Sequence, residues 1–140
     1  MAGALDGVMV LDLTTHLSGP FCGMQLGDLG ADVVKIESPQ GDSMRGTPPF
    51  LEGESAPFML WNRNKRGLRL DLKNADDLET FWGLVDQADV MLENFRLACR
   101  TLQQSAEEAQ VPPAITHDGV TARYMPALTT SSLLTCQYCP

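Results

Sequence analysis

The chain lacks the features that mark membrane and secreted proteins. No apolar run in its 140 residues approaches the roughly 18 residues that a transmembrane helix needs. The first residues contain neither a basic segment nor an apolar one, so we expect no secretory signal. Its four cysteines are too few and too irregularly spaced for a disulfide framework. We therefore expect a cytoplasmic protein with reduced thiols and no membrane insertion.

Positive charge is also scarce. Ten Lys and Arg stand against 18 Asp and Glu, for a net charge of -8, which argues against a nucleic-acid partner because such a surface needs clustered cations. The basic segment 62–66 is a local exception, and both a phosphate pocket and a solvated turn are open for it. A content of 44% hydrophobic and 20% charged residues is typical of one globular domain with a substantial core.

The N-terminal part of the chain shows a strand–helix–strand pattern. Residues 8–13 and 31–36 are short and almost entirely apolar, which is typical of strands buried on both faces of a parallel sheet. Pro20 suits the first turn of a helix, and Gly30 is a natural stop. The sequence thus predicts a crossover helix between two parallel strands.

The alternation of strands and helices continues. Residues 38–53 predict a long loop without strands, and 54–61 a short helix. Residues 68–72 alternate apolar and charged side chains, which favours a strand with an exposed face or at a sheet edge. Asn74 is expected to cap the next helix, and 89–94 to form a fourth strand. The pattern predicts an α/β fold with a doubly wound, mostly parallel, Rossmann-like sheet.

This pattern is lost after Arg96. We therefore divide the chain into a Rossmann-like portion, 1–96, and an atypical, irregular tail, 97–140, in which no strand is expected. A shifted reading frame or an altered exon is one hypothesis for the tail. The pair Cys136 and Cys139 forms a lone C-x-x-C, which is weak evidence for zinc or redox chemistry, and we expect no metal.

Ligands of open α/β sheets bind beyond the carboxyl ends of the strands. Here those ends are the segments 14–18, 37–40 and 94–96. Gly19-Pro20 is either part of such a site or a good turn into a helix. A dinucleotide site is disfavoured, although Glu37 stands where a ribose-binding acid belongs, because the G-x-G-x-x-G spacing is missing.

Short blocks between residues 5 and 96 resemble, in their order and spacing, the class III CoA-transferases, the family of formyl-CoA transferase and carnitine CoA-transferase. The blocks are Leu5-Asp6-Gly7, Val10-Leu11-Asp12-Leu13-Thr14, Gly19-Pro20, Leu29-Gly30-Ala31-Asp32-Val33, Lys35-Ile36-Glu37, Gly41-Asp42, Arg45-Gly46, Asn62-Arg63-Asn64-Lys65-Arg66, Leu70-Asp71-Leu72-Lys73, Ala88-Asp89-Val90 and Glu93-Asn94-Phe95-Arg96.

The resemblance implies that coenzyme A lies across the carboxyl ends of these strands, as the acyl-CoA substrate. Adenine needs an aromatic face and polar groups at its edge, and the phosphates need cations. The residues assigned to CoA by position are Leu17, Ser18, Leu70, Asp71, Leu72, Lys73, Asn94, Phe95 and Arg96.

The family reaction moves CoA from an acyl-CoA to a free carboxylic acid through an aspartate nucleophile. The resemblance places that aspartate beyond the matched region, so the sheet is incomplete relative to the family and no catalytic residue is assigned here. The family also implies a homo-oligomer, a dimer of longer chains. Two departures stand out, because some members have an arginine where this chain has Ser38, and a Pro-Gly turn where it has Leu97-Ala98.

Other interpretations stay open beside a truncated CoA-transferase. A 2-methylacyl-CoA racemase shares the same motifs, and a non-catalytic fragment that binds CoA or a partner is a third possibility. At the residue level, Phe95 fits a core position and Asp12 a cap of local backbone groups. His16 is interpreted as a loop side chain rather than a base, because no partner for it is evident.

Overall fold

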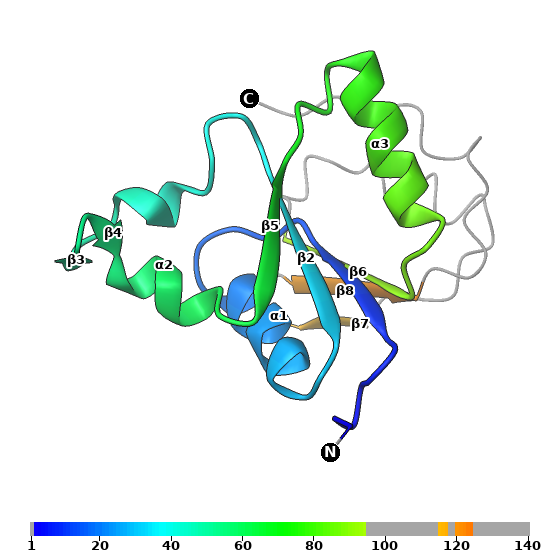
Figure 1. Ribbon diagram of the computed structural model, residues 1–140, viewed down its shortest axis with the longest axis horizontal. Helices are drawn as coiled ribbons and strands as arrows, with labels where there is room; N and C mark the ends of the chain where they lie inside the picture. Colours follow the sequence, from blue (N-terminus) through cyan, green and yellow to red (C-terminus); the bar gives the residue numbers. More distant parts are fainter. Residues whose placement is uncertain (1, 95–114, 118–119, 125–140) are drawn as a thin grey trace.

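A computed structural model describes residues 2–94, 115–117 and 120–124. One sheet has the strand order β5-β2-β1-β6-β8-β7, and β3 and β4 form a small hairpin (Figure 1). Strands β5, β2, β1 and β6 run parallel to one another, which confirms the α/β, mostly parallel architecture. The elements are β1 (Met9–Asp12), α1 (Ser18–Asp28), β2 (Asp32–Glu37), η1 (Ser43–Gly46), β3 (Phe50–Leu51), β4 (Glu54–Ser55), α2 (Ala56–Trp61), β5 (Lys65–Arg69), α3 (Ala75–Val85), β6 (Val90–Glu93), β7 (Ile115–His117) and β8 (Val120–Tyr124).

Alternate side chains of the central strands pack on opposite faces of the sheet, because successive residues of a strand point to opposite sides. Leu11 and Val34 belong to the core that includes Phe81 of α3. Val10 and Val33 belong to a second core, against which side chains of α1 pack. Helices α1 and α3 therefore cover opposite faces, as Figure 1 shows. The buried segments 8–13 and 31–36 were correctly interpreted as strands covered on both sides.

Helix α1 lies very close to the end of β1. It begins at Ser18, two residues before the expected start at Pro20. A Cβ atom on Gly19 would stand 2.3 Å from Cβ of Thr14, and one on Gly23 would stand 2.7 Å from Oδ2 of Asp12. Larger side chains at these glycines would push the helix away from the strand, so the two glycines bring α1 down onto the carboxyl end of the sheet.

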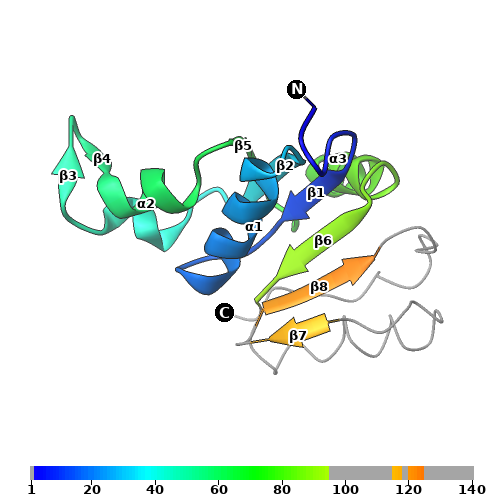
Figure 2. The same ribbon diagram turned by 90° about the horizontal axis from the view of Figure 1, so that it is seen from below.

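Residues 38–64 form an arm that extends to one side of the sheet (Figure 1 and Figure 2). The arm contains the hairpin, so the expectation of no strand within 38–53 is wrong for the two residues of β3. Helix α2 begins at Ala56 because Ser55 caps it, its Oγ accepting a hydrogen bond from the Phe58 N–H at 3.3 Å. The rings of Trp61 and Phe21 meet edge to face at 5.6 Å, which ties the arm to α1.

The third strand of the parallel sheet begins earlier than the sequence predicted. Strand β5 spans Lys65–Arg69, whereas the alternation of apolar and charged residues favoured 68–72. Its position at the edge of the sheet was correctly predicted. Asn74 caps α3 as expected, because its Oδ1 accepts hydrogen bonds from the N–H groups of Asp76 and Asp77.

The expectation of an irregular tail without strands is wrong for two segments. Strand β8 pairs antiparallel with β6, placing Ala122 opposite Leu92, and β7 pairs antiparallel with β8. Figure 2 shows these two strands continuing the sheet beyond β6. An open strand edge offers a row of hydrogen-bonding groups to any extended segment that reaches it. Pairing with β6, rather than local sequence pattern, therefore defines these strands.

Candidate functional site

Two neighbouring strand ends are joined by one side chain at the carboxyl edge of the sheet. Asn94, which follows β6, accepts a hydrogen bond from the Thr15 N–H at 3.1 Å and donates one to the Thr15 carbonyl at 2.8 Å. Because Thr15 lies in the loop after β1, this double hydrogen bond fixes that loop against β6. Asn94 is one of the residues that the sequence assigned to the site, and the structure gives it this positioning contact.

Beyond this clamp, the loop turns outward and leads into α1. His16 has a left-handed backbone with φ of 68°, which is uncommon for a residue other than glycine. Leu17 is 53% exposed and Ser18 is exposed as the first residue of α1. No side chain caps α1. Two assigned site residues, Leu17 and Ser18, therefore lie at an open helix start that can meet a ligand.

The assigned segment after β5 divides between core and surface. Leu70 is 5% exposed and packs in the core, and Leu72 is half-buried against that core. Asp71 shapes the turn, accepting a hydrogen bond from the Lys73 N–H at 3.1 Å. Lys73 is exposed. The segment thus presents Lys73 to solvent, while the leucine side chains hold it in place.

The assigned segments share one edge, but the segment after β5 is separated from the other two by β2. Strand β2 lies between β1 and β5, so with about 4.8 Å between neighbouring strands the ends of β1 and β5, from which two of these segments lead, stand on the order of 10 Å apart. A ligand that touches both must be long. Phe95 and Arg96 lie outside the described residues, as do Cys136 and Cys139.

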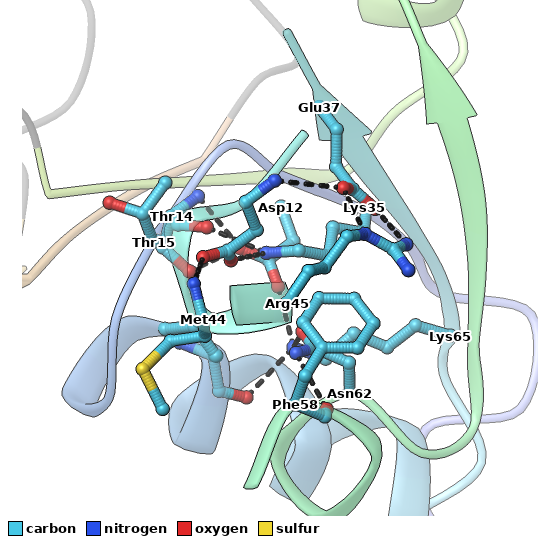
Figure 3. A network of polar contacts seen from close by, with 12 residues as sticks. Asp12, Thr14, Thr15, Lys35, Glu37, Met44, Arg45, Phe58, Asn62 and Lys65 are labelled. Carbon is cyan, nitrogen blue, oxygen red and sulfur yellow. Dashed lines mark hydrogen bonds and ion pairs between the residues drawn. The ribbon is translucent and has the colours of Figure 1, made fainter. Parts of the chain in front are cut away.

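A buried ion pair lies directly beneath this edge (Figure 3). The Asp12 and Lys65 side chains are 0% and 1% exposed, and Lys65 Nζ stands 2.7 Å from Asp12 Oδ2. Asp12 also accepts hydrogen bonds from the N–H and Oγ1 of Thr14. Lys65 donates further to the Pro20 carbonyl at 2.8 Å and to Asn62 Oδ1 at 3.0 Å. One ammonium group thereby connects β1, α1, the arm and β5.

A second set of charges joins β2 to the arm. Lys35 Nζ donates to the Thr14 carbonyl at 2.7 Å and stands 2.9 Å from Oδ2 of Asp42, with both side chains buried. Glu37 accepts two hydrogen bonds from the Arg45 guanidinium, at 2.7 and 2.8 Å. Arg45 in turn lies over the ring of Phe58, 3.9 Å from its centre. These contacts hold η1 and α2 beside the ends of β1 and β2.

The environment of the network shifts the pKa of groups within it and beside it. Burial lowers the pKa of the Lys65 ammonium, and the Asp12 carboxylate opposes that shift only in part. Burial, reinforced by Asp12, raises the pKa of the Cys22 thiol. For Glu37 burial acts upward, but the hydrogen bonds from Arg45 and from the Asp42 N–H hold its pKa below the usual range.

Sequence reasoning missed this network. Asp12 does cap local backbone, as one interpretation held, but it also binds Lys65. The basic segment 62–66 is not a wholly solvated turn, because Lys65 is buried and Arg63 and Arg66 pair with carboxylates. The available signal was the presence of charged residues in two otherwise apolar strands, Asp12 in β1 and Lys35 and Glu37 in β2.

The described residues show neither a metal-binding cluster nor a membrane-spanning helix. No group of three or more His, Cys, Asp or Glu side chains in that part of the chain is placed to hold a metal ion. None of the helices found there is long and apolar enough to cross a membrane.

Comparison with known proteins identifies the family. Residues 5–111 match CoA-transferase family III, and the chain belongs to this family. The match extends beyond Arg96, where the resemblance was expected to end. The chain is 52% identical over 99 residues to succinyl-CoA:mesaconate CoA-transferase of Haloarcula hispanica, covering 67% of this chain and 25% of that protein. It is 43% identical over 93 residues to human succinyl-CoA:glutarate CoA-transferase, covering 65% and 21%.

Solved structures agree with this assignment. The fold is similar to a CAIB/BAIF family protein from Brucella suis, with a TM-score of 0.66 and 41% identity over 71% of this chain and 28% of that one. A hypothetical protein from Mycobacterium tuberculosis is similar with a TM-score of 0.63 and 39% identity, over 74% and 28%. The chain spans about a quarter of the length of the curated relatives.

Proposed function

We propose that this chain is the CoA-binding portion of a class III CoA-transferase, whose reaction moves CoA from an acyl-CoA to a free carboxylic acid. The observation that carries the proposal is the clamp between Asn94 and Thr15. It joins two strand ends at the edge where open α/β sheets bind ligands and leaves Leu17 and Ser18 exposed beside it.

The shape of this edge suits a long ligand. Leu17 and Lys73 are exposed on segments that follow β1 and β5, two strands separated by β2. CoA is an extended molecule with phosphates near one end and a thiol at the other. Lys73 offers a cation for a phosphate. Phe95 and Arg96 are retained in the proposal on the family resemblance.

Calorimetric titration with CoA tests the binding proposal. We expect Lys73→Ala to weaken binding about 3- to 10-fold, because one exposed charge contact with a phosphate is lost. Phe95→Ala should weaken binding as well, through the loss of the proposed stacking face. Arg66→Ala is the control, since it removes an exposed cation of β5, the strand that precedes Lys73, and this cation is already paired with Asp32. Equal heats in all four proteins would refute the site.

Catalysis is a separate matter. We expect the 140-residue chain alone not to transfer CoA, because only binding residues, and no carboxylate nucleophile, are assigned within the matched region. The loss of a catalytic nucleophile lowers the rate by a factor on the order of 10⁶ in one well-studied enzyme. The assay uses succinyl-CoA, acetyl-CoA and formyl-CoA with a panel of carboxylic acids. Turnover that Asp118→Asn abolishes would contradict the expectation and identify a nucleophile.

The partners proposed for the complete enzyme follow from the same family. They are an acyl-CoA, a carboxylic acid and a second copy of the chain in a homo-oligomer. Succinyl-CoA is the first donor to test, because the names of the two relatives above both contain it.

A further inference from the structure

Most lysine and arginine side chains in residues 2–94 already have a carboxylate partner. Arg69 and Lys73 are the exceptions within that range, with no ion pair to a described residue. The pairs are Lys35 with Asp42, Arg45 with Glu37, Arg63 with Asp28, Lys65 with Asp12, and Arg66 with Asp32.

The two uncommitted cations lie at the same place in the fold. Arg69 is the last residue of β5, and Lys73 follows four residues later. Both therefore belong to the carboxyl edge of the sheet, where the proposed CoA site lies, whereas Arg66 pairs with Asp32 at the start of β2. Asp71, Asp76 and Asp77 follow closely in the chain, so these two cations offer an anionic ligand direct contacts rather than a positive field.

The acidic residue that stands beside Arg69 in the sheet forms no ion pair with it. In the register of the parallel strands Arg69 stands beside Glu37. Both carboxylate oxygens of Glu37 are already occupied, Oε1 by Arg45 and Oε2 by Arg45 and the Asp42 N–H. Glu37 therefore binds residues of the arm, and the Arg69 guanidinium can still bind an anion.

The Arg69 side chain also points toward the loop that follows β2. Its Nη2 atom is 3.7 Å from the position that a Cβ on Gly41 would occupy. Gly41 has φ of 81° and closes a turn through a hydrogen bond from its N–H to the Ser38 carbonyl at 2.8 Å. The guanidinium is thus exposed between two of the loops that border the edge. Its planar array of N–H donors matches the oxygens of a phosphate.

We infer that Arg69 binds a phosphate group of the CoA substrate, beside Lys73. This inference rests on the proposed function and adds to it a residue that the family blocks did not assign. Arg69 would contribute affinity for the phosphorylated end of the ligand and would not act on the thioester.

Calorimetric titration of the 140-residue chain with CoA and with 3′-dephospho-CoA tests the inference. Arg69→Ala should weaken CoA binding about 10-fold, since a hydrogen bond to a charged group is lost, and Arg69→Lys should weaken it less because the charge remains. Arg66→Ala, which removes a paired cation from the same strand, should bind CoA as the unaltered chain does. Thermal melts of the variants check that each one folds.

The outcomes separate the inference from the proposed function. If the Arg69→Ala penalty disappears with 3′-dephospho-CoA, the contact is with the 3′-phosphate; if it persists, the contact is with the diphosphate; both results support the inference. CoA binding by Arg69→Ala equal to that of the unaltered chain overturns the inference alone. Failure of the unaltered chain to bind CoA overturns the proposed function, and the inference with it.

Discussion

The buried ion pair between Asp12 and Lys65 stabilises the part of the fold that lies under the candidate site. Their charges are almost wholly removed from water, so either partner left alone would be a buried, uncompensated charge. We expect Asp12→Asn to lower the free energy of unfolding by about 3 kcal/mol, measured by urea titration with circular dichroism. Asp32→Asn is the control, because its pair with Arg66 is exposed and is worth at most about 1 kcal/mol. Similar small losses in both variants would contradict this view.

Glu37 makes the stability of the arm depend on pH. Its pKa in the folded chain lies below the ordinary value of about 4.3, so its stabilising effect is complete above that pH and is lost as the pH falls through the lower, folded value. At pH 7 we expect Glu37→Gln to be less stable than the unaltered chain by about 2 kcal/mol.

Measuring the free energy of unfolding of Glu37→Gln and of the unaltered chain at acid pH tests this role of the ionised carboxylate. The stability difference between Glu37→Gln and the unaltered chain should shrink as the pH falls below about 4. Glu79→Gln, on the exposed surface of α3, controls for the loss of one negative charge. A difference that stays constant from pH 7 to acid pH would show that the ionised carboxylate of Glu37 is not the stabilising species.

At the scale of elements, the glycines of α1 and α3 have opposite roles. Gly19 has no room for a side chain, because a Cβ there would overlap Thr14, whereas a Cβ on Gly83 would meet nothing within 4 Å. We expect Gly19→Ala to destabilise the chain by about 1 to 3 kcal/mol. Gly83→Ala lies in α3, which like α1 has 11 residues, and this substitution should stabilise the chain by about 0.5 to 1 kcal/mol. Thermal melts measure both, and a shift of the same sign in the two variants would refute the close approach of α1.

At the scale of the whole molecule, the described part of the chain leaves apolar surface and an open strand edge. Strand β5 ends the sheet on one side, and the arm exposes Phe50, Leu51 and Leu60 by half or more of their surface. Exposed apolar groups of this kind favour association. We expect sedimentation to show species larger than a monomer.

Variants can locate the surface responsible for that association. Leu51→Glu together with Leu60→Glu should shift the chain toward a monomer, because charges on the arm oppose apolar contact. Thr80→Glu places one charge on the exposed surface of α3 and should leave the association unchanged. A monomer of the unaltered chain that melts in one sharp transition would show that these surfaces do not drive association.

Local pattern was enough for the class of fold. Short, mostly apolar segments such as 31–36 are typical of strands covered on both faces, and the alternation of such segments with helical ones indicates a parallel sheet. The resemblance carried by the short blocks of residues 5–96 was sufficient for the family, because order and spacing are properties of the sequence itself.

Only the tertiary structure decided which charges are free. Nothing in the local sequence distinguishes Lys65, buried against Asp12, from Arg69, exposed at the end of the same strand, because ion pairing depends on groups brought together from distant parts of the chain. The strands β7 and β8 were also decided at that level, since an extended segment becomes a strand when a neighbouring edge supplies its hydrogen bonds. The sequence by itself therefore determined the sheet and the family, and long-range pairing determined the ion pairs and the last strands.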